Sequence, residues 1–169
     1  MLTIVENALT AETYCRLRQK VQFRPYQPED AKTDLANSLF TTEVRENGRA
    51  VGMARIVGDG RIAFFFKDVV VDPDRQGCGI GQMLMHSLLR YVNTAGCDGA
   101  YVGLMATPGT EGFYEKYGFI RRPTPELGHG MVQFVPVALP ETAAATAGRY
   151  PSPAAVSTPA FEAKKEDFP

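Results

Sequence analysis

The chain has 169 residues, of which 44% are hydrophobic and 22% charged, and this is the length and composition of one ordinary globular domain. Its formal net charge of -1 at pH 7 gives it no general attraction for nucleic acid or for an anionic membrane. No stretch of the sequence approaches the roughly 20 apolar residues that span a bilayer, so we expect no nucleic-acid partner and no membrane partner.

The first forty residues predict a short strand followed by two helices. The strand covers residues 2–5, and Thr10 then suits the N-cap of a helix that presents Tyr14 and Leu17 on one face. Pro28 suits the first position of a second helix, where a backbone N–H is not needed.

Three antiparallel strands are predicted next, over residues 39–46, 49–57 and 61–71. The first two flank Asn47-Gly48, which is the strongest short signal for a β-hairpin. A Gly-Asp-Gly turn connects the second of these strands to the third.

The pattern then changes to that of a βαβ unit. A glycine-rich turn at residues 77–81 opens a long helix, and residues 100–106 predict a buried strand. Because a helix separates this strand from its predecessor, we expect the two strands to be parallel. Thr107 and Pro108 predict the start of a short helix that ends at Gly118.

The sequence predicts an α/β fold with one mixed sheet, antiparallel over strands one to four and parallel across strands four and five, with helices on both faces. Two closing strands are expected over residues 119–122 and 131–137, which gives a domain over residues 1–137. Residues 138–169 are dominated by Ala, Pro, Thr and Ser. They hold too few large apolar side chains to offset their ordering entropy, so a mostly irregular tail is predicted.

The cysteines and histidines do not suggest a metal centre. Cys15, Cys78 and Cys97 lack paired metal spacing, and His86 and His129 are far apart. Free thiols fit a reducing compartment, and no basic region precedes an apolar run at the start, so we expect a cytoplasmic protein without a metal. Catalysis would then use carboxylates, tyrosines, backbone groups or a bound cofactor.

The segment around three closely spaced glycines, Gly77, Gly79 and Gly81, is the most informative one. Glycines let the backbone approach a ligand, and the free N–H groups of a helix start, together with the helix dipole, suit a pyrophosphate. Arg75 would add a charge at the edge. The lysine and hydroxyl of a nucleotide P-loop are absent, and a dinucleotide fold would place its glycine turn after a first parallel strand.

Two segments carry a resemblance to a known family. Residues 76–81, Gln-Gly-Cys-Gly-Ile-Gly, resemble the Gln/Arg-x-x-Gly-x-Gly/Ala signature of the GNAT superfamily of N-acetyltransferases, and they follow a Val-Val-Val-Asp-Pro run as in that family's fourth strand and turn. Residues 113–119, Phe-Tyr-Glu-Lys-Tyr-Gly-Phe, are similar to the helix-to-strand segment after strand five. The resemblance covers residues 50–119 well and the first forty loosely, and the tail has no counterpart.

The resemblance implies acetyl-CoA as co-substrate. Backbone N–H groups of residues 77–82 would hold its pyrophosphate, and backbone groups of Val69 and Val71 would pair with its pantetheine arm where strands four and five splay apart. Many relatives have an asparagine at the position of Thr107, so one contact is weakened or replaced here. The residues expected at the CoA site are Val69, Val70, Val71, Arg75, Gln76, Gly77, Cys78, Gly79, Ile80, Gly81, Gln82, Thr107, Phe113 and Lys116.

Because holding the amine and the thioester together should outweigh any one titrating group, we predict direct acetyl transfer without an acyl-enzyme. Tyr114 falls where many members keep a tyrosine near the CoA sulfur as general acid; the alternative is an aromatic side chain packed under the sheet. Asp68 is the first candidate for attracting or deprotonating the amine, and Glu43 is the second. The alternative for Asp68 is a buried partner of Arg55 or Lys67.

The acceptor is not identified by the sequence. Arg24 and Tyr26 precede the second helix, where relatives often build the acceptor pocket. A small-molecule primary amine is the leading hypothesis, with a protein or peptide acetyltransferase and a non-catalytic CoA-binding sensor as alternatives. Residues 68–71 also resemble aminosugar-phosphate acetyltransferases, and the whole segment resembles plastid-type amine acetyltransferases. A homodimer is compatible with the family, whose closing strands commonly meet a second subunit.

Overall fold

The computed structural model describes residues 1–132. The chain divides into two units, and the first of them, Met1–Gly128, is the fold described here. The expected tail, residues 138–169, lies outside the described residues.

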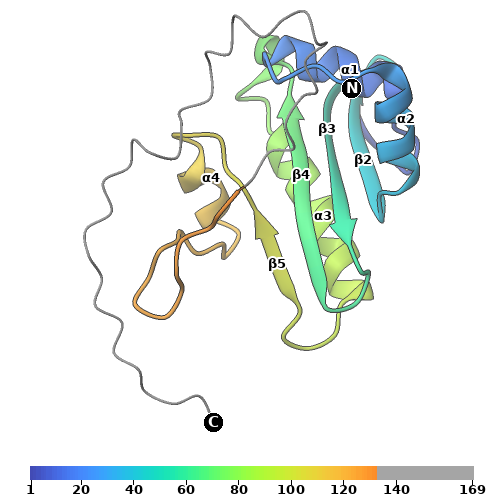
Figure 1. Cartoon of the computed structure of the whole chain (residues 1–169). Coiled ribbons are helices and arrows are strands. Elements are labelled where there is room, and N and C mark those ends of the chain that lie inside the picture. The colour runs from blue at the N-terminus through green and yellow to red at the C-terminus, as the bar shows by residue number, and fades with distance from the viewer. Residues whose placement is uncertain (133–169) are drawn as a thin grey trace, which may run out of the picture. The chain divides into compact units, whose positions relative to one another are not determined.

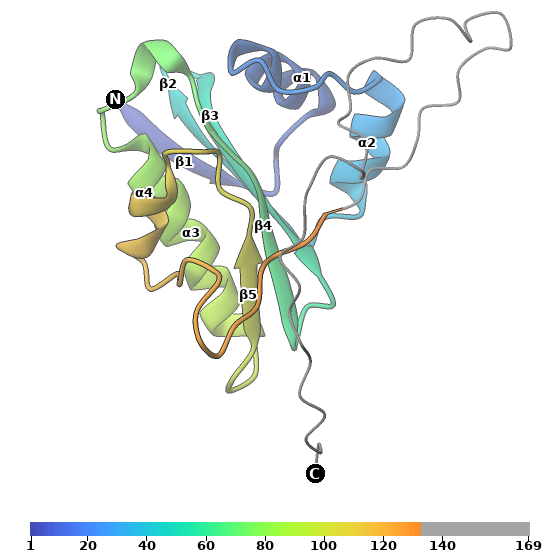
Figure 2. The same cartoon turned by 60° about the vertical axis from the view of Figure 1, so that its left-hand side comes forward.

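One five-stranded sheet forms the centre of this unit, with strand order β1-β2-β3-β4-β5 (Figure 1; β1 is labelled in Figure 2). The first four strands are antiparallel and β5 runs parallel to β4, which confirms the predicted mixed sheet. The strands are β1 Leu2–Glu6, β2 Phe40–Glu46, β3 Arg49–Gly58, β4 Ala63–Val71 and β5 Tyr101–Leu104.

Helices cover both faces of the sheet, as predicted (Figure 2). Two of them, α1 and α2, lie on one face, and α3 and α4 lie on the other. Among residues 1–132, no helix has both the length and the apolarity needed to cross a membrane. The helices are α1 Ala11–Lys20, α2 Pro28–Ala36, α3 Ile80–Ala95 and α4 Glu111–Glu115, with a short 3₁₀ turn, η1, at Pro73–Arg75.

Each face has its own apolar core. On the α3 face, Leu84, Met85 and Leu88 are fully buried against the sheet. On the α1 face, Tyr14 and Leu17 are fully buried, and they pack in a cluster with buried side chains of β3 and β4. At roughly 1.5–3 kcal/mol for each large apolar side chain, this burial fixes both helices on the sheet.

The local signals of the sequence are confirmed. The hydroxyl of Thr10 accepts a hydrogen bond from the Thr13 N–H at 3.2 Å and so caps α1. Pro28 occupies the first turn of α2. Asn47 and Gly48 both have positive φ angles, 50° and 79°, as a tight hairpin turn with a right-handed twist requires.

A β-bulge in β4 changes which face its side chains point to. Asp68 has a φ of 54°, and the register places Arg55 opposite Lys67 but Met53 opposite Val70, so one extra residue stands in β4. A bulge of this kind redirects the side chains that follow it. Phe66, two residues earlier, packs against α3, but Asp68 points to the face of α1 and α2.

The pairing of β4 with β5 stops just before this bulge. It begins at Ala63 and Tyr101 and ends at Phe66 and Leu104. Within the described part of the chain, the backbone of β4 from residue 67 to residue 71 therefore has no strand partner on the β5 side. This is the splayed geometry that the resemblance implies for strands four and five.

The predicted helix start at Thr107 is wrong. Thr107 and Pro108 instead begin a β-turn, which the Thr110 N–H closes on the Thr107 carbonyl at 3.0 Å. Gly109, with a φ of 86°, supplies the left-handed residue that follows proline in a type II turn. The helix α4 consequently begins at Glu111.

The first predicted closing strand is also wrong. Residues 119–122 are irregular, and Pro123 and Pro125, just after them, have no N–H with which to continue a sheet ladder. Phe119 is held by its ring, whose centroid lies 5.6 Å from that of Phe66. Of the second predicted strand, residues 131 and 132 are not in a strand, and the rest lies outside the described residues.

Candidate active site

The glycine loop between β4 and α3 presents a row of unused backbone donors. Gly77 and Gly79 have φ angles of 77° and 79°, which an L side chain rarely adopts. No N–H from residue 77 to residue 82 donates a hydrogen bond within residues 1–132, and Gly79 caps α3 without a side-chain bond. These amides, at the positive end of a long helix, can bind an anion with two adjacent phosphates.

Some of the predicted CoA residues outside this loop lie next to it. A Cβ on Gly81 would lie 3.2 Å from the ring of Phe113 and 3.9 Å from a methyl of Val71, so α4 and β4 both meet α3 at this glycine. Ile80 is buried beneath the loop, and Val70 is buried on the α1 face. These last two can therefore offer a ligand only their backbone groups.

The remaining predicted CoA residues lie at the periphery. Arg75 forms an ion pair with Glu46 at 2.7 Å, so it must exchange that partner to reach a phosphate. Gln76 and Cys78 are exposed in the loop, and Lys116 is exposed just after α4. Thr107 uses its carbonyl for the turn described above.

The loop is anchored to α1 through Asp72. This carboxylate is buried, and it accepts hydrogen bonds from Lys20 Nζ at 2.7 and 2.8 Å and from the Asp74 N–H at 3.2 Å. Burial works to raise the pKa of Asp72, but the bonds from Lys20 and the Asp74 amide outweigh it and lower that pKa. The strand end and the glycine loop are thereby fixed relative to α1.

Tyr114, on α4, is half-buried among other aromatic side chains. Its ring lies 5.1 Å from that of Phe113 and 6.2 Å from that of Phe119. Burial raises the pKa of Tyr114, so its hydroxyl stays protonated at neutral pH. Tyr117 packs on Phe113 and on His86.

A pocket of about 460 Å³ lies on the opposite face, between α1, α2, β3 and β4. Its wall includes Tyr26, Asp34 and Arg55, and on β4 it reaches Lys67 and Asp68, where the pairing with β5 has ended. The pocket and the glycine loop therefore meet the same short stretch of β4. Such a volume suits a small ligand.

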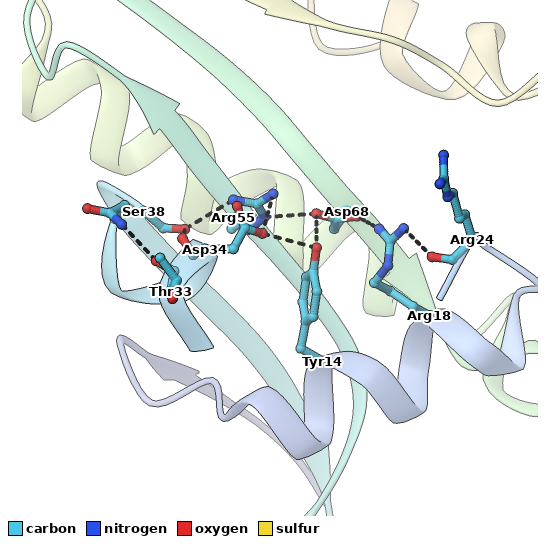
Figure 3. A network of polar contacts seen from close by, with 9 residues as sticks. Tyr14, Arg18, Arg24, Thr33, Asp34, Ser38, Arg55 and Asp68 are labelled. Atoms are coloured by element: carbon cyan, nitrogen blue, oxygen red, sulfur yellow. Dashed lines mark hydrogen bonds and ion pairs between the residues drawn. The ribbon is translucent and has the colours of Figure 1, made fainter. Parts of the chain in front are cut away.

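Asp68 is the centre of a polar network on the floor of this pocket (Figure 3). Its Oδ1 pairs with Arg18, and its Oδ2 accepts from Arg55 Nε at 2.8 Å and from the Tyr14 hydroxyl at 2.9 Å. The side chain is only 4% exposed. The alternative of a buried ion pair with Arg55 is confirmed. A direct contact of Asp68 with an amine would require one of these bonds to break.

Asp34 is a second carboxylate of this network, and the sequence analysis missed it. Its Oδ2 pairs with Arg55 Nη2 at 2.7 Å and accepts from the Tyr14 hydroxyl at 3.3 Å. Burial and then the charge of Asp68 raise the pKa of Tyr14, which keeps this hydroxyl a donor. The available signal was the four-residue spacing of Tyr14 and Arg18, and of Asp30 and Asp34, since such pairs share a helix face.

The predicted acceptor residues are only partly brought together. Tyr26 lines the pocket, half-exposed, with its ring centroid 4.6 Å from the Arg18 guanidinium. Arg24 lies beside the pocket and accepts a hydrogen bond from Arg18 at its backbone carbonyl, 2.9 Å. Glu43 lies outside the pocket wall, because it is buried on β2 and bound to Arg45.

The family is settled by comparison with known proteins. A model of the acetyltransferase (GNAT) domain matches residues 38–121, which include the glycine loop and α4. A "Probable Acetyltransferase" of known structure from meticillin-resistant Staphylococcus aureus is 31% identical, with a TM-score of 0.73, over 80% of this chain and 100% of that one. The chain belongs to the GNAT acetyltransferase family.

Two curated relatives of this GNAT protein come from plants. The chloroplastic GCN5-related N-acetyltransferase 1 of Arabidopsis thaliana is 34% identical over 100 residues, which is 56% of this chain and 49% of that protein. The chloroplastic serotonin N-acetyltransferase 2 of Oryza sativa subsp. japonica is 38% identical over 76 residues, 45% of this chain and 37% of that protein. The chain thus spans about half the length of the curated relatives it matches, or less.

Replacing Asp68 by Asn should destabilise the GNAT domain. Arg18 would keep a buried charge without its partner, and Arg55 would lose one of its two carboxylates, which costs about 3 kcal/mol or more. Asp34→Asn removes the same charge from a side chain that is 38% exposed, and it should cost at most about 1 kcal/mol. Urea unfolding of the two variants measures the difference; equal losses would contradict the central position of Asp68.

Proposed function

We propose that this protein transfers the acetyl group of acetyl-CoA directly to a primary amine of a small molecule. The observation that carries the proposal is the glycine loop, whose N–H groups from residue 77 to residue 82 have no partner among the described residues and lie at the start of α3. A second feature, the pocket of about 460 Å³, meets the same part of β4 from the other face.

The donor set of the loop fits the pyrophosphate of CoA. Backbone amides and a helix dipole neutralise phosphate charge without a large side chain, and Arg75 can add a formal charge at the rim. The β4 backbone at Val69 and Val71 has no strand partner on the β5 side among residues 1–132, so it can pair with the extended pantetheine arm. CoA supplies the acetyl group as a thioester.

The chain contributes alignment and one proton donor. An alkylamine has a pKa near 10.4 and must lose a proton before it attacks. Holding it beside the thioester supplies about 7–11 kcal/mol, more than any single titrating group. Tyr114, which keeps its proton at neutral pH, is the group we assign to protonate the departing sulfur. The cationic amine gives up two protons in all, of which one restores Tyr114 and the other leaves to solvent. Asp68, on the pocket floor, stays a candidate for relaying them through water.

The size of the pocket favours a small molecule as the acceptor. About 460 Å³ lies within the range of small-ligand sites, and the rice relative is named for serotonin, a small amine. A peptide acceptor has one observation in its favour: a second hollow of about 360 Å³ shares Arg18 and Tyr26 with the first. A peptide of two or more residues could extend past Tyr26 and occupy both hollows.

Replacing Gly79 by Ala should weaken CoA binding by roughly tenfold or more. A left-handed conformation costs a non-glycine residue about 1–2 kcal/mol, so the loop would relax away from the conformation that aims its amides. Gly99→Ala is the matched control, since Gly99 has a φ of 75°, open space around its Cβ position and a place in the turn before β5. Calorimetric titration with CoA measures both; equal affinities would count against the loop as the phosphate site.

Release of free CoA thiol with a panel of amines tests the reaction itself. We expect release that depends on the amine, and a Tyr114→Phe variant that turns over about 100-fold more slowly with CoA affinity within twofold. Tyr117→Phe, which keeps its ring against Phe113 and His86, should turn over like the unchanged protein.

Turnover of Tyr114→Phe within twofold of the unchanged protein would remove the acid role. Binding of acetyl-CoA without thiol release on any amine would instead favour a sensor.

A further inference from the structure

The two carboxylates in the pocket network have different freedom to meet a ligand. Asp68 has both oxygens occupied by Arg18, Arg55 and the Tyr14 hydroxyl, and its side chain is 4% exposed. Asp34 takes its protein partners on Oδ2, and no hydrogen bond or ion pair to its Oδ1 is found within residues 1–132. The Asp34 side chain is 38% exposed and lies in the pocket wall.

Both arginines of the pocket are already neutralised. Arg18 is paired with Asp68, and Arg55 is paired with Asp68 and with Asp34, at less than 10% exposure of either arginine side chain. They therefore do not offer a free cationic site to an anionic ligand. Lys67 is the remaining cation of the wall, and it is an exposed residue of β4.

The helix α2 holds Asp34 in place. Ala31, one turn earlier on α2, is fully buried and belongs to the same apolar cluster as Tyr14 and Leu17. The helix α2 therefore cannot rotate without opening that core. Asp34 is then held by the Arg55 guanidinium at 2.7 Å, and the strand pairing places Arg55 directly opposite Lys67 at the start of the unpaired part of β4. One carboxylate oxygen of this pocket-lining residue is fixed by the protein, and the other has no protein partner among residues 1–132.

We propose that Asp34 binds the ammonium group of the acceptor and that Asp68 is a positioning residue, which holds Arg55 and Tyr14 and through them Asp34. The inference rests on the proposed function and deepens it, because it makes the substrate class an amine that arrives as a cation. Asp68 cannot exchange a partner without leaving a buried arginine unpaired, whereas Asp34 can accept a further hydrogen bond at no such cost.

A hydrogen bond between ammonium and carboxylate is worth about 1.5–3 kcal/mol, so its loss should cost about 10- to 100-fold in KM for the amine. Asp34→Asn keeps the shape of the side chain and removes its charge. The matched control is Glu29→Gln, which removes one negative charge from the same helix at an exposed position outside the pocket wall.

The test measures steady-state kinetics with three probes, serotonin, putrescine and a lysine-containing peptide, and uses the one that the unchanged protein acetylates fastest. Asp34→Asn should raise KM for that amine 10- to 100-fold, with kcat and CoA affinity within threefold. Glu29→Gln should leave KM within twofold. Circular dichroism confirms that each variant is folded.

Two results would overturn the inference while leaving the proposed function intact: KM within twofold in Asp34→Asn, or an equal rise in Glu29→Gln. A parallel loss of CoA affinity in Asp34→Asn would also overturn it, since the residue would then act on the whole fold. If the unchanged protein acetylates none of the three amines, the proposed acceptor class fails, and the inference fails with it.

Discussion

The carboxylate of Asp68 lies at the β-bulge of β4, and the arrangement of the pocket residues depends on it. Its left-handed backbone inserts one residue into β4 and turns its side chain toward α1 and α2, where Arg18, Arg55 and Tyr14 receive it. The two segments that carry these partners, α1 and β3, are thereby joined at one buried charge. The strand β4 stops pairing with β5 just before this point. Its edge toward β5 is therefore open near the bulge, and Asp68 itself lies in the wall of the pocket on the α1 and α2 face.

The two halves of the candidate site offer different groups to a ligand, backbone amides in the glycine loop and side chains in the pocket. The glycine loop offers amides, which bind a phosphate group whatever the neighbouring side chains are, and this explains how a short glycine pattern can mark the family. The pocket on the other face, which we propose receives the acceptor, is lined by charged side chains that come from α1, α2, β3 and β4. A ligand held by the loop and a ligand held in the pocket would both reach the residues of β4 that follow Phe66.

The fold was predictable where local chemistry determines it, and the polar network of the pocket was not. The Asn47-Gly48 hairpin, the Thr10 cap and the parallel β5 all follow from signals within a few residues or from one intervening helix. The turn at Thr107 was missed because proline was taken as a helix start, although Gly109 after it fits a type II turn better. The network around Asp68 joins residues 13 to 54 positions apart in the chain, and no local pattern encodes such pairing.

Amide hydrogen exchange with and without CoA tests the central claim most directly, that one stretch of backbone from β4 into α3 receives the cofactor. CoA should protect the amides of residues 77–82 and those of Val69 to Val71, and it should leave the β1–β2 ladder, Leu2–Glu6 with Phe40–Glu46, unchanged. Protection confined to other parts of the chain, or binding with no change at residues 77–82, would contradict the account.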